Sequence, residues 1–143
     1  MKTESTWLWF ALGSAFFGGA TAVLAKIGVE GIDSNLATFY RTLIVLAFAG
    51  LIVSLRGDWA ALGSMSTRSL AFLTLSGLAT AASWLCYFRA LQLAPVSQVA
   101  PIDKLSVAIA IALSVLLLAE PISLRLILGA ALIIAGTMVV ASA

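Results

Sequence analysis

Residues Ser97 to Leu118 have the sequence SQVAPIDKLSVAIAIALSVLLL, in which two adjacent charges precede a long apolar run. The stretch has about the 20 residues that a helix needs to cross roughly 30 Å of hydrocarbon. An ionisable side chain inside such a span costs at least about 2.5 kcal/mol, so it usually faces a protein interior or an aqueous path and has a partner. Asp103 and Lys104 are therefore the first place to look for function.

The composition is that of an integral membrane protein. The chain has 143 residues, of which 62% are hydrophobic and 10% charged, and its mean hydropathy is +1.14. Soluble domains are only about 45 to 50% apolar. The net charge of +2 comes from scattered basic residues that form no run able to hold nucleic acid, so we expect no nucleic-acid partner. With no His and only Cys86 as a thiol, the chain offers no Cys/His metal site and no internal disulfide, and we expect no cofactor.

Five apolar stretches approach the length of a membrane span, and turn residues separate them. We therefore predict an all-α membrane protein in which residues 1–143 form a single five-helix domain. Ser34-Asn35 and Ser123 are candidate N-caps for the second and fifth helices. The expected spans are Trp7 to Ile27, Leu36 to Leu55, Leu70 to Leu91, Ser97 to Leu118 and Leu124 to Ala141.

The first span has one feature of a signal peptide, because Ala20-Thr21-Ala22 has the small-x-small form of a cleavage site. The preceding residues carry one Lys and one Glu, and the apolar sequence continues past the site. We therefore favour a retained span.

Orientation is weakly specified by the basic residues that flank the spans. On the N-terminal side of the membrane we count Lys2, Arg56, Arg68 and Arg125, and on the other side Lys26, Arg41, Arg89 and Lys104. Counting only residues outside the spans favours a cytoplasmic N-terminus. The sequence permits either this fixed orientation or insertion in both orientations.

An odd number of spans places the two termini on opposite sides of the membrane. If such a domain were duplicated and fused, the second copy would be inverted relative to the first. Many transporters are built in this way, with the substrate site near the midplane between the repeats. A single unit has half of such a site, which an antiparallel homodimer or a different partner would complete. Small residues that let helices approach closely recur on the first and fifth spans, for contacts within the chain or with a second copy: Ser14, Ala15, Gly18, Gly19, Ala22, Gly129, Ala131, Ala135 and Gly136.

Charged residues of the second and fourth spans are expected at one depth. Arg41 lies about five residues into its span, and Asp103 and Lys104 lie about six or seven into theirs; at 1.5 Å per residue this is roughly 8 to 10 Å inside the same face. Lys26 and Arg89, at the ends of the first and third spans, would surround the mouth of this basic vestibule.

Two interpretations of this vestibule remain open. In the structural one, Asp103 pairs with Arg41 or a neighbouring Lys, and the long basic side chains reach the interface. In the functional one, the basic groups bind an anionic group of a solute, while Asp103 positions a basic residue or carries a coupling proton. Ser106, one helical turn beyond Asp103, begins a stripe of small and polar residues that either lines a pathway or packs closely.

Pro101 also has two interpretations. Inside the helix it removes a backbone donor and frees carbonyls that an ion or solute could use. If the helix begins near Ala100, Pro101 is a favourable first-turn residue, which is the interpretation we favour.

Trp84 and Tyr87 lie three residues apart on the third span and share one side of the helix. They either wall a solute site or lie against an interior basic group, and the alternative for Tyr87 is an interfacial belt. Trp84 is too deep for such a belt.

The order of these residues resembles the EamA family of the drug/metabolite transporter superfamily over nearly the whole chain. The resemblance is carried by Ala22-Val23-Leu24-Ala25-Lys26-Ile27-Gly28, Tyr40-Arg41-Thr42, Ala90-Leu91, Ala94-Pro95-Val96-Ser97, Pro101-Ile102-Asp103-Lys104-Leu105-Ser106, Leu118-Ala119-Glu120, Gly129 and Gly136. It implies a multi-pass carrier of small metabolites in the bacterial inner membrane, with a cavity between two inverted units. Most members resemble two such units fused into ten helices, whereas this chain resembles one unit.

We therefore predict a transporter of small polar solutes that works by alternating access as an antiparallel homodimer. Its expected pathway residues are Arg41, Asp103, Lys104, Ser106, Trp84 and Tyr87, with Lys26 and Arg89 in the vestibule. The alternative is a non-transporting scaffold or accessory subunit whose charges lock helix packing. An intramembrane enzyme is disfavoured, because no nucleophile, base and metal-ligand set converges.

Overall fold

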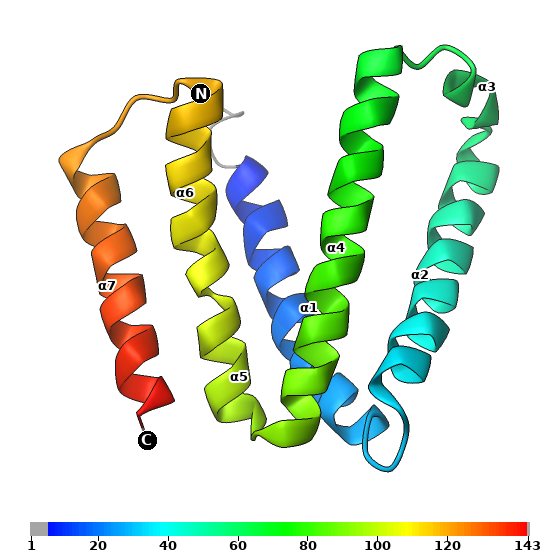
Figure 1. The fold of residues 1–143 in the computed structure, drawn as a ribbon. Helices are drawn as coiled ribbons and strands as arrows, with labels where there is room; N and C mark the ends of the chain where they lie inside the picture. Colours follow the sequence, from blue (N-terminus) through cyan, green and yellow to red (C-terminus); the bar gives the residue numbers. More distant parts are fainter. Residues whose placement is uncertain (1–5, 143) are drawn as a thin grey trace. The chain divides into compact units, whose positions relative to one another are not determined.

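The computed structural model describes residues 6–142, and the regular structure in this part of the chain is entirely helical. Helices are expected here because, in lipid, only intrahelical hydrogen bonds satisfy the backbone of a single span. Figure 1 shows the helices in chain order: α1 (Thr6–Gly28), α2 (Ser34–Arg56), α3 (Trp59–Leu62), α4 (Thr67–Leu93), α5 (Val96–Asp103), α6 (Leu105–Leu118) and α7 (Leu124–Ala141).

Five segments of the described residues are long and apolar enough to cross a membrane: α1, α2, α4, α5 together with α6, and α7. The prediction of an all-α protein with five spans is therefore confirmed. The third span begins at Thr67 rather than Leu70, and the four-residue helix α3 precedes it in a connection where the sequence indicated only turn residues.

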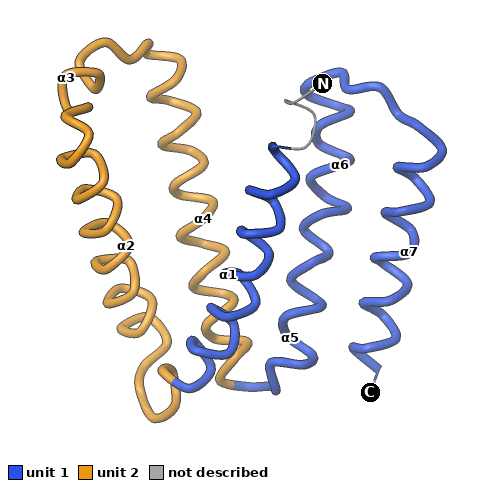
Figure 2. Tube along the Cα trace, turned by 180° about the vertical axis from the view of Figure 1, so that it is seen from behind, with its two compact units in different colours: residues 1–27, 93–143 blue, residues 28–92 orange. Residues whose placement is uncertain are grey.

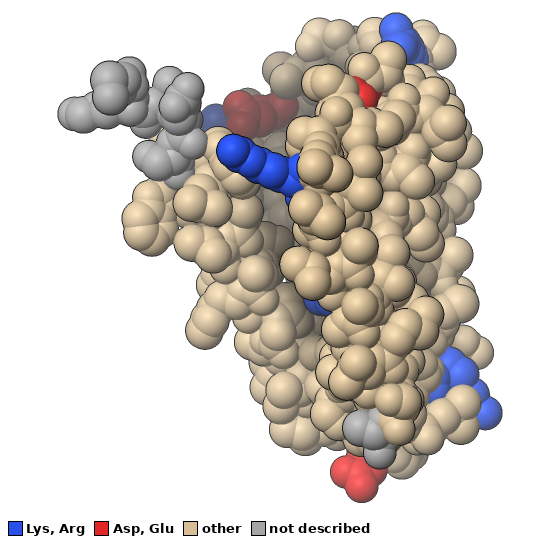
Figure 3. Space-filling model, turned by 90° about the vertical axis from the view of Figure 1, so that its left-hand side faces the viewer, with Lys and Arg blue, Asp and Glu red and all other residues tan. Residues whose placement is uncertain are grey.

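The five spans direct their apolar side chains outward. At most 6% of the residues in the apolar window of any span are buried, and side chains such as Phe10 and Leu116 are each 77% exposed. In Figure 3 the middle of the face is mostly uncharged, and most of the charged side chains lie toward its two ends. In water so much exposed apolar surface would drive association, so these faces suit lipid or a partner helix.

The chain divides into two compact units, coloured separately in Figure 2. Unit 1 comprises Met1–Ile27 and Leu93–Ala143, and unit 2 comprises Gly28–Gln92. The residues that carry charge inside the spans are distributed between them, with Arg41 in unit 2 and the Asp103–Lys104 pair in unit 1.

In unit 1, α5 and α6 pack against each other and both pack against α7. The helix of the fourth span is broken at Lys104, which has turn-like dihedral angles (φ −71°, ψ −7°). On either side of the break, the Lys104 N–H donates to the Pro101 carbonyl (2.9 Å) and the Val107 N–H donates to the Lys104 carbonyl (3.0 Å). These three-residue turns are tighter than those of an α-helix, which makes the break a defined structure.

Pro101 lies inside a helix, so the favoured interpretation of it as a first-turn residue is wrong. The helix begins at Val96, after Pro95 in an extended conformation, and Pro101 is the sixth residue of α5. An internal proline cannot donate to the carbonyl four residues earlier, here that of Ser97, and its ring weakens the helix at that point. The break at Lys104 follows within one turn.

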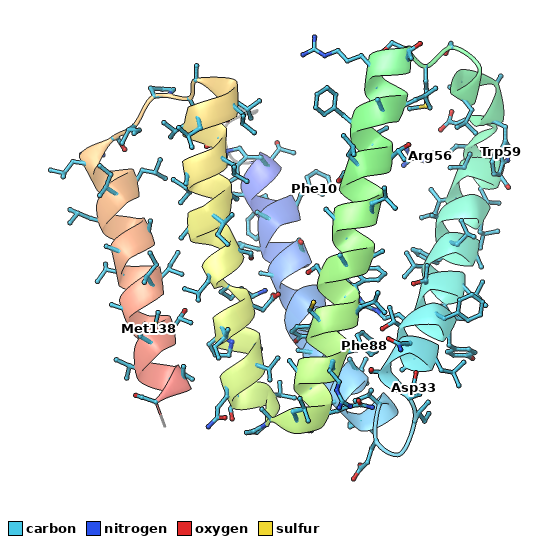
Figure 4. All side chains as sticks on the ribbon, in the orientation of Figure 1. Phe10, Asp33, Arg56, Trp59, Phe88 and Met138 are labelled. Carbon is cyan, nitrogen blue, oxygen red and sulfur yellow. The ribbon has the colours of Figure 1, made fainter. Side chains whose placement is uncertain are left out.

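In unit 2, the connection between α1 and α2 is held against the end of α4. Gln92 donates from its side-chain amide to the Ile32 carbonyl (2.6 Å), and Val29 and Leu91 are almost completely buried. Phe88, also buried, and Asp33 lie toward the same end of this unit (Figure 4). The packed end of unit 2 is therefore the end that carries Arg41, the eighth residue of α2.

The N-cap of α2 is Asp33 rather than Ser34-Asn35. Its carboxylate accepts from the backbone N–H groups of Asn35 (2.9 Å) and Leu36 (3.2 Å). Ser34 is the first residue of α2 and is buried, so the residue that flanks the helix is Asp33. Its side chain accepts the hydrogen bonds of the first turn. The predicted cap Ser123 is confirmed, since its hydroxyl accepts from the Leu126 N–H (3.2 Å).

The glycines of α1 and α7 make no close helix contact within unit 1. A Cβ atom added at Gly18, Gly19, Gly129 or Gly136 would meet nothing within 4 Å outside its own helix backbone. Close approach to the helices of unit 2 or to a second copy stays a prediction for these four positions.

Candidate functional site

Arg41 lies on the aromatic side chains of α4. Its guanidinium carbon is 4.1 Å from the centre of the Trp84 ring and 5.5 Å from that of Phe88. All three residues belong to unit 2, and Trp84 and Phe88 are four residues apart, so they lie on one face of α4. Trp84 was expected either to wall a solute site or to lie against a basic group, and the structure shows that it contacts a basic group.

This cluster holds a cation inside a span by cation–π attraction, which is worth up to about 2 kcal/mol where the cation is desolvated. Arg41 and Trp84 are each partly buried, and Phe88 is buried at 3% exposure. Tyr87 is also partly buried and lies next to Phe88 in the chain. The faces of the Trp84 and Phe88 rings thus attract the charge of the Arg41 guanidinium.

The hydroxyl groups of Thr38 and Thr42, on either side of Arg41 in the sequence, are satisfied within α2. The Thr38 hydroxyl donates to the Ser34 carbonyl, and the Thr42 hydroxyl donates to the Thr38 carbonyl, each at 2.8 Å. These bonds leave Arg41 as the charged group available for an external partner in this part of α2.

Arg89, predicted for the vestibule, has a local partner. Its guanidinium donates to the Gln92 side-chain oxygen (3.0 Å), and Gln92 in turn donates to the Ile32 carbonyl. Arg89 therefore helps to hold the α1–α2 connection, and this relay through Gln92 was not foreseen from the sequence.

Lys26, the other vestibule residue, lies at the end of α1. Its ammonium donates to the Ala94 carbonyl (3.1 Å) in the connection between α4 and α5. Both residues belong to unit 1, so this bond ties two parts of that unit that are far apart in sequence.

Asp103 and Lys104 pair with each other at the break between α5 and α6. The Lys104 ammonium is 3.2 Å from the Asp103 carboxylate, and the two side chains are 61% and 37% exposed respectively. A neighbouring Lys was one of the two partners expected for Asp103. The pair therefore gives each charge a partner inside the fourth span, as ionisable groups at that position need.

The small and polar stripe beyond Asp103 is only partly continuous. Ser106 lies in the first turn of α6, on the far side of the break, and is exposed. Ser114 donates to the Ile111 carbonyl (3.0 Å) of its own helix. The shared depth of Arg41 and the Asp103–Lys104 pair stays a prediction, because they lie in different units.

Thr137 on α7 was missed by the sequence reasoning. Its side chain is buried at 5% exposure, and its hydroxyl donates to the Pro101 carbonyl (3.2 Å). The signal was present, since Thr137 is the one hydroxyl residue within the apolar sequence of α7.

The described residues contain no group of three or more Cys, Asp, Glu or His side chains that would hold a metal ion. Cys86 is exposed on α4 and has a free thiol. The chemistry that the charged residues do offer is the binding of ions and polar groups, by a guanidinium in one unit and by a carboxylate and an ammonium at a helix break in the other.

Comparison with known protein families matches residues 5–142 to the EamA-like transporter family. The chain belongs to the EamA-like transporter family. It is therefore a multi-pass membrane transporter and not an enzyme, as the resemblance and the spans predicted.

One relative of this EamA-family transporter is a protein of Sinorhizobium sp named "Uncharacterized transporter in cobO 3'region". The two are 46% identical over 138 residues, which cover 96% of this chain and 98% of the relative. The relative thus has about the same length as this single five-span unit. No solved structure matches this transporter.

Proposed function

We propose that residues 1–143 form one transmembrane domain of a carrier for small polar solutes, which works by alternating access as an antiparallel homodimer. The observation that carries the proposal is that the five-helix domain has an odd number of spans. Two such units in opposite orientations would reproduce the inverted-repeat plan of larger transporters, in which rocking about a central site exposes it to each side in turn.

The uncovered faces of α1 and α7 support the dimer. Small residues in membrane helices mark close helix–helix contacts, and the glycines of these helices have open space around them within unit 1. A second copy of the chain is the simplest source of helices that could pack against these glycines. The even distribution of basic residues between the two sides would permit both orientations.

We assign the solute pathway to the charged and aromatic residues inside the spans. In unit 2 these are Arg41, Trp84 and Tyr87, and in unit 1 they are Asp103, Lys104 and Ser106. The proline-linked break supports this assignment, because discontinuous helices form the ion and substrate sites of many transporters. Lys26 and Arg89 serve as vestibule residues that also hold the connections beside it.

We place the protein in the inner membrane of a bacterium. The spans suit a lipid bilayer, and the Sinorhizobium relative is bacterial. No cofactor is required, because conformational exchange around a bound solute accounts for transport.

The dimer is tested by the orientation of the termini in the native membrane. A single cysteine added after the last residue, in a Cys86→Ala background, is labelled with a membrane-impermeant maleimide before and after lysis. We expect about half of the copies to react before lysis. A single orientation in every copy would exclude an antiparallel homodimer.

Transport itself is tested separately in reconstituted vesicles, with the solutes that most stabilise the purified protein. Saturable uptake is the expected result. Co-purification with a larger membrane protein and no uptake by this chain alone would instead support the accessory-subunit alternative.

A further inference from the structure

We infer that Arg41 is an oxyanion-binding residue that takes a carboxylate or phosphate group of the solute, with Trp84 as its positioning residue. The inference rests on the proposed carrier function and narrows its solutes to those bearing such a group. It starts from the position of Arg41, the eighth residue of α2, roughly 10 Å along the helix from Ser34 at 1.5 Å per residue.

The charge of Arg41 has no Asp or Glu partner within unit 2. Neither α2 nor α4 contains an Asp or Glu. The acidic residues of unit 2 lie in its connections, and one of them, Asp33, already caps α2. The described ion pair of this chain joins Lys104 to Asp103 instead.

The N–H groups of Arg41 have no hydrogen-bond acceptor within unit 2. Its guanidinium lies over the Trp84 and Phe88 rings, which attract the cation through the ring faces, and it also interacts electrostatically with Tyr87. A guanidinium has five N–H donors, and they point outward in its plane. The two rings therefore support the charge but offer the N–H groups no oxygen acceptor.

This arrangement favours an oxyanion over other ligands. A guanidinium fork donates two parallel hydrogen bonds to a carboxylate or phosphate, and these charge-assisted bonds are about twice as strong as neutral ones. Contact with the aromatic rings already restricts the Arg41 side chain, so less conformational entropy is lost when it binds a ligand. The half-buried position of Arg41 leaves its edge reachable while limiting competition from water.

Two sources could supply the group, a soluble solute or a lipid headgroup phosphate. The test therefore uses purified protein in a maltoside detergent and Tris chloride, where neither buffer nor detergent carries an oxyanion. Sodium acetate and inorganic phosphate are the probes, with sodium chloride at equal ionic strength as the reference. Short-chain phosphatidylglycerol is the lipid probe, and the readouts are the thermal unfolding midpoint and calorimetric binding.

We expect acetate or phosphate to raise the unfolding midpoint above the chloride reference, as a ligand that prefers the folded state does. Arg41→Gln should weaken this binding at least about tenfold, the equivalent of losing one charge-assisted hydrogen-bond pair. Arg41→Lys, which keeps the charge without the fork, should bind with intermediate strength. Trp84→Leu should weaken binding while leaving the protein folded.

Arg68 provides the matched control. It also lies over an aromatic ring, with its guanidinium carbon 5.9 Å from the centre of the Phe72 ring, but it is the second residue of α4 and lies outside the proposed pathway. Arg68→Gln should bind acetate and phosphate as the unaltered protein does.

Equal stabilisation by chloride, or unchanged binding in folded Arg41→Gln or Arg41→Lys protein, would overturn the inference. A response to phosphatidylglycerol but not to acetate or phosphate would show that Arg41 binds lipid, which also overturns it. Because the assay measures binding and no flux, it is independent of the uptake assay. Oxyanion binding without uptake would contradict the carrier function alone, and uptake without oxyanion binding would contradict this site alone.

Discussion

The Thr137 hydroxyl on α7 donates a hydrogen bond to the Pro101 carbonyl on α5, over 3.2 Å. Thr137 is buried, and Pro101 lies three residues before the break in the fourth span. The bond therefore joins the last span to the one place in the fourth span where the helix is interrupted. Because backbone groups in lipid need partners from the protein, this bond stabilises the geometry of the break.

We predict that Thr137→Val lowers the free energy of unfolding by roughly 0.5 to 1.5 kcal/mol, because valine keeps the shape and removes the donor. Thr137→Ser keeps the hydroxyl and serves as the control. Reversible unfolding in mixed micelles measures both. Equal stability of the valine and serine variants would show that the bond contributes nothing.

We predict that Pro101→Ala makes the fourth span more continuous. Alanine supplies the N–H that the Ser97 carbonyl lacks and removes the ring that weakens the helix. Hydrogen exchange of the backbone amides from Ile102 to Ser106 should slow in the variant. Pro95→Ala, which changes the residue before α5, is the control and should leave exchange at these amides as it was. Unchanged exchange in Pro101→Ala would mean that Lys104 breaks the helix for another reason.

The spans were predictable from the sequence because their length is set by the thickness of the membrane. Five apolar stretches of about the required length permit few other folds. The break at Lys104 was harder to place, because a proline suits either the first turn or a kink, and the choice depends on where the helix begins. Here the extended Pro95 starts the helix at Val96, which puts Pro101 inside it.

The contacts of the candidate site were only partly predictable from the sequence. Helical spacing placed Trp84 and Tyr87 on one side of α4, and contact with a basic group was one of the two interpretations of Trp84. It did not identify Phe88 as the second ring or Thr137 as the partner of Pro101. Such contacts join separate helices, and their registers are set by packing that local sequence does not specify.

We predict that Arg41 and Trp84 stabilise the fold as a pair. Arg41→Gln, Trp84→Leu and the double variant form a cycle that isolates their interaction from the effects of each change alone. We expect a coupling free energy of about 0.5 to 2 kcal/mol, the range for cation–π contacts. Arg68→Gln with Trp84→Leu is the control cycle, since Arg68 contacts Phe72 rather than Trp84, and it should give no coupling. No coupling in the first cycle would show that the contact between Arg41 and Trp84 does not stabilise the fold.

We predict that the N-terminus of α2 needs a side-chain oxygen at position 33 as its hydrogen-bond acceptor. Asp33→Ala should lower the free energy of unfolding by about 1 kcal/mol, because the N–H groups of Asn35 and Leu36 lose their acceptor. Asp33→Asn keeps an acceptor and should retain most of the stability. If Ser34→Ala were as costly as Asp33→Ala, the assignment of the cap would be wrong.

The last prediction separates function from structure at the Asp103–Lys104 pair. The two charges pair with each other inside the fourth span, so removing one leaves the other unpaired there, and we expect each single variant to lower the free energy of unfolding by at least about 1 kcal/mol. If the two groups contact solute, Asp103→Asn and Lys104→Gln should each reduce uptake roughly tenfold or more, because each removes a charged hydrogen-bonding partner. Uptake in vesicles containing equal amounts of folded protein measures this, and Arg125→Gln, at the start of α7, is the control that should transport normally. Normal uptake in both variants would remove the pair from the pathway, whereas loss of folding would assign it to helix packing.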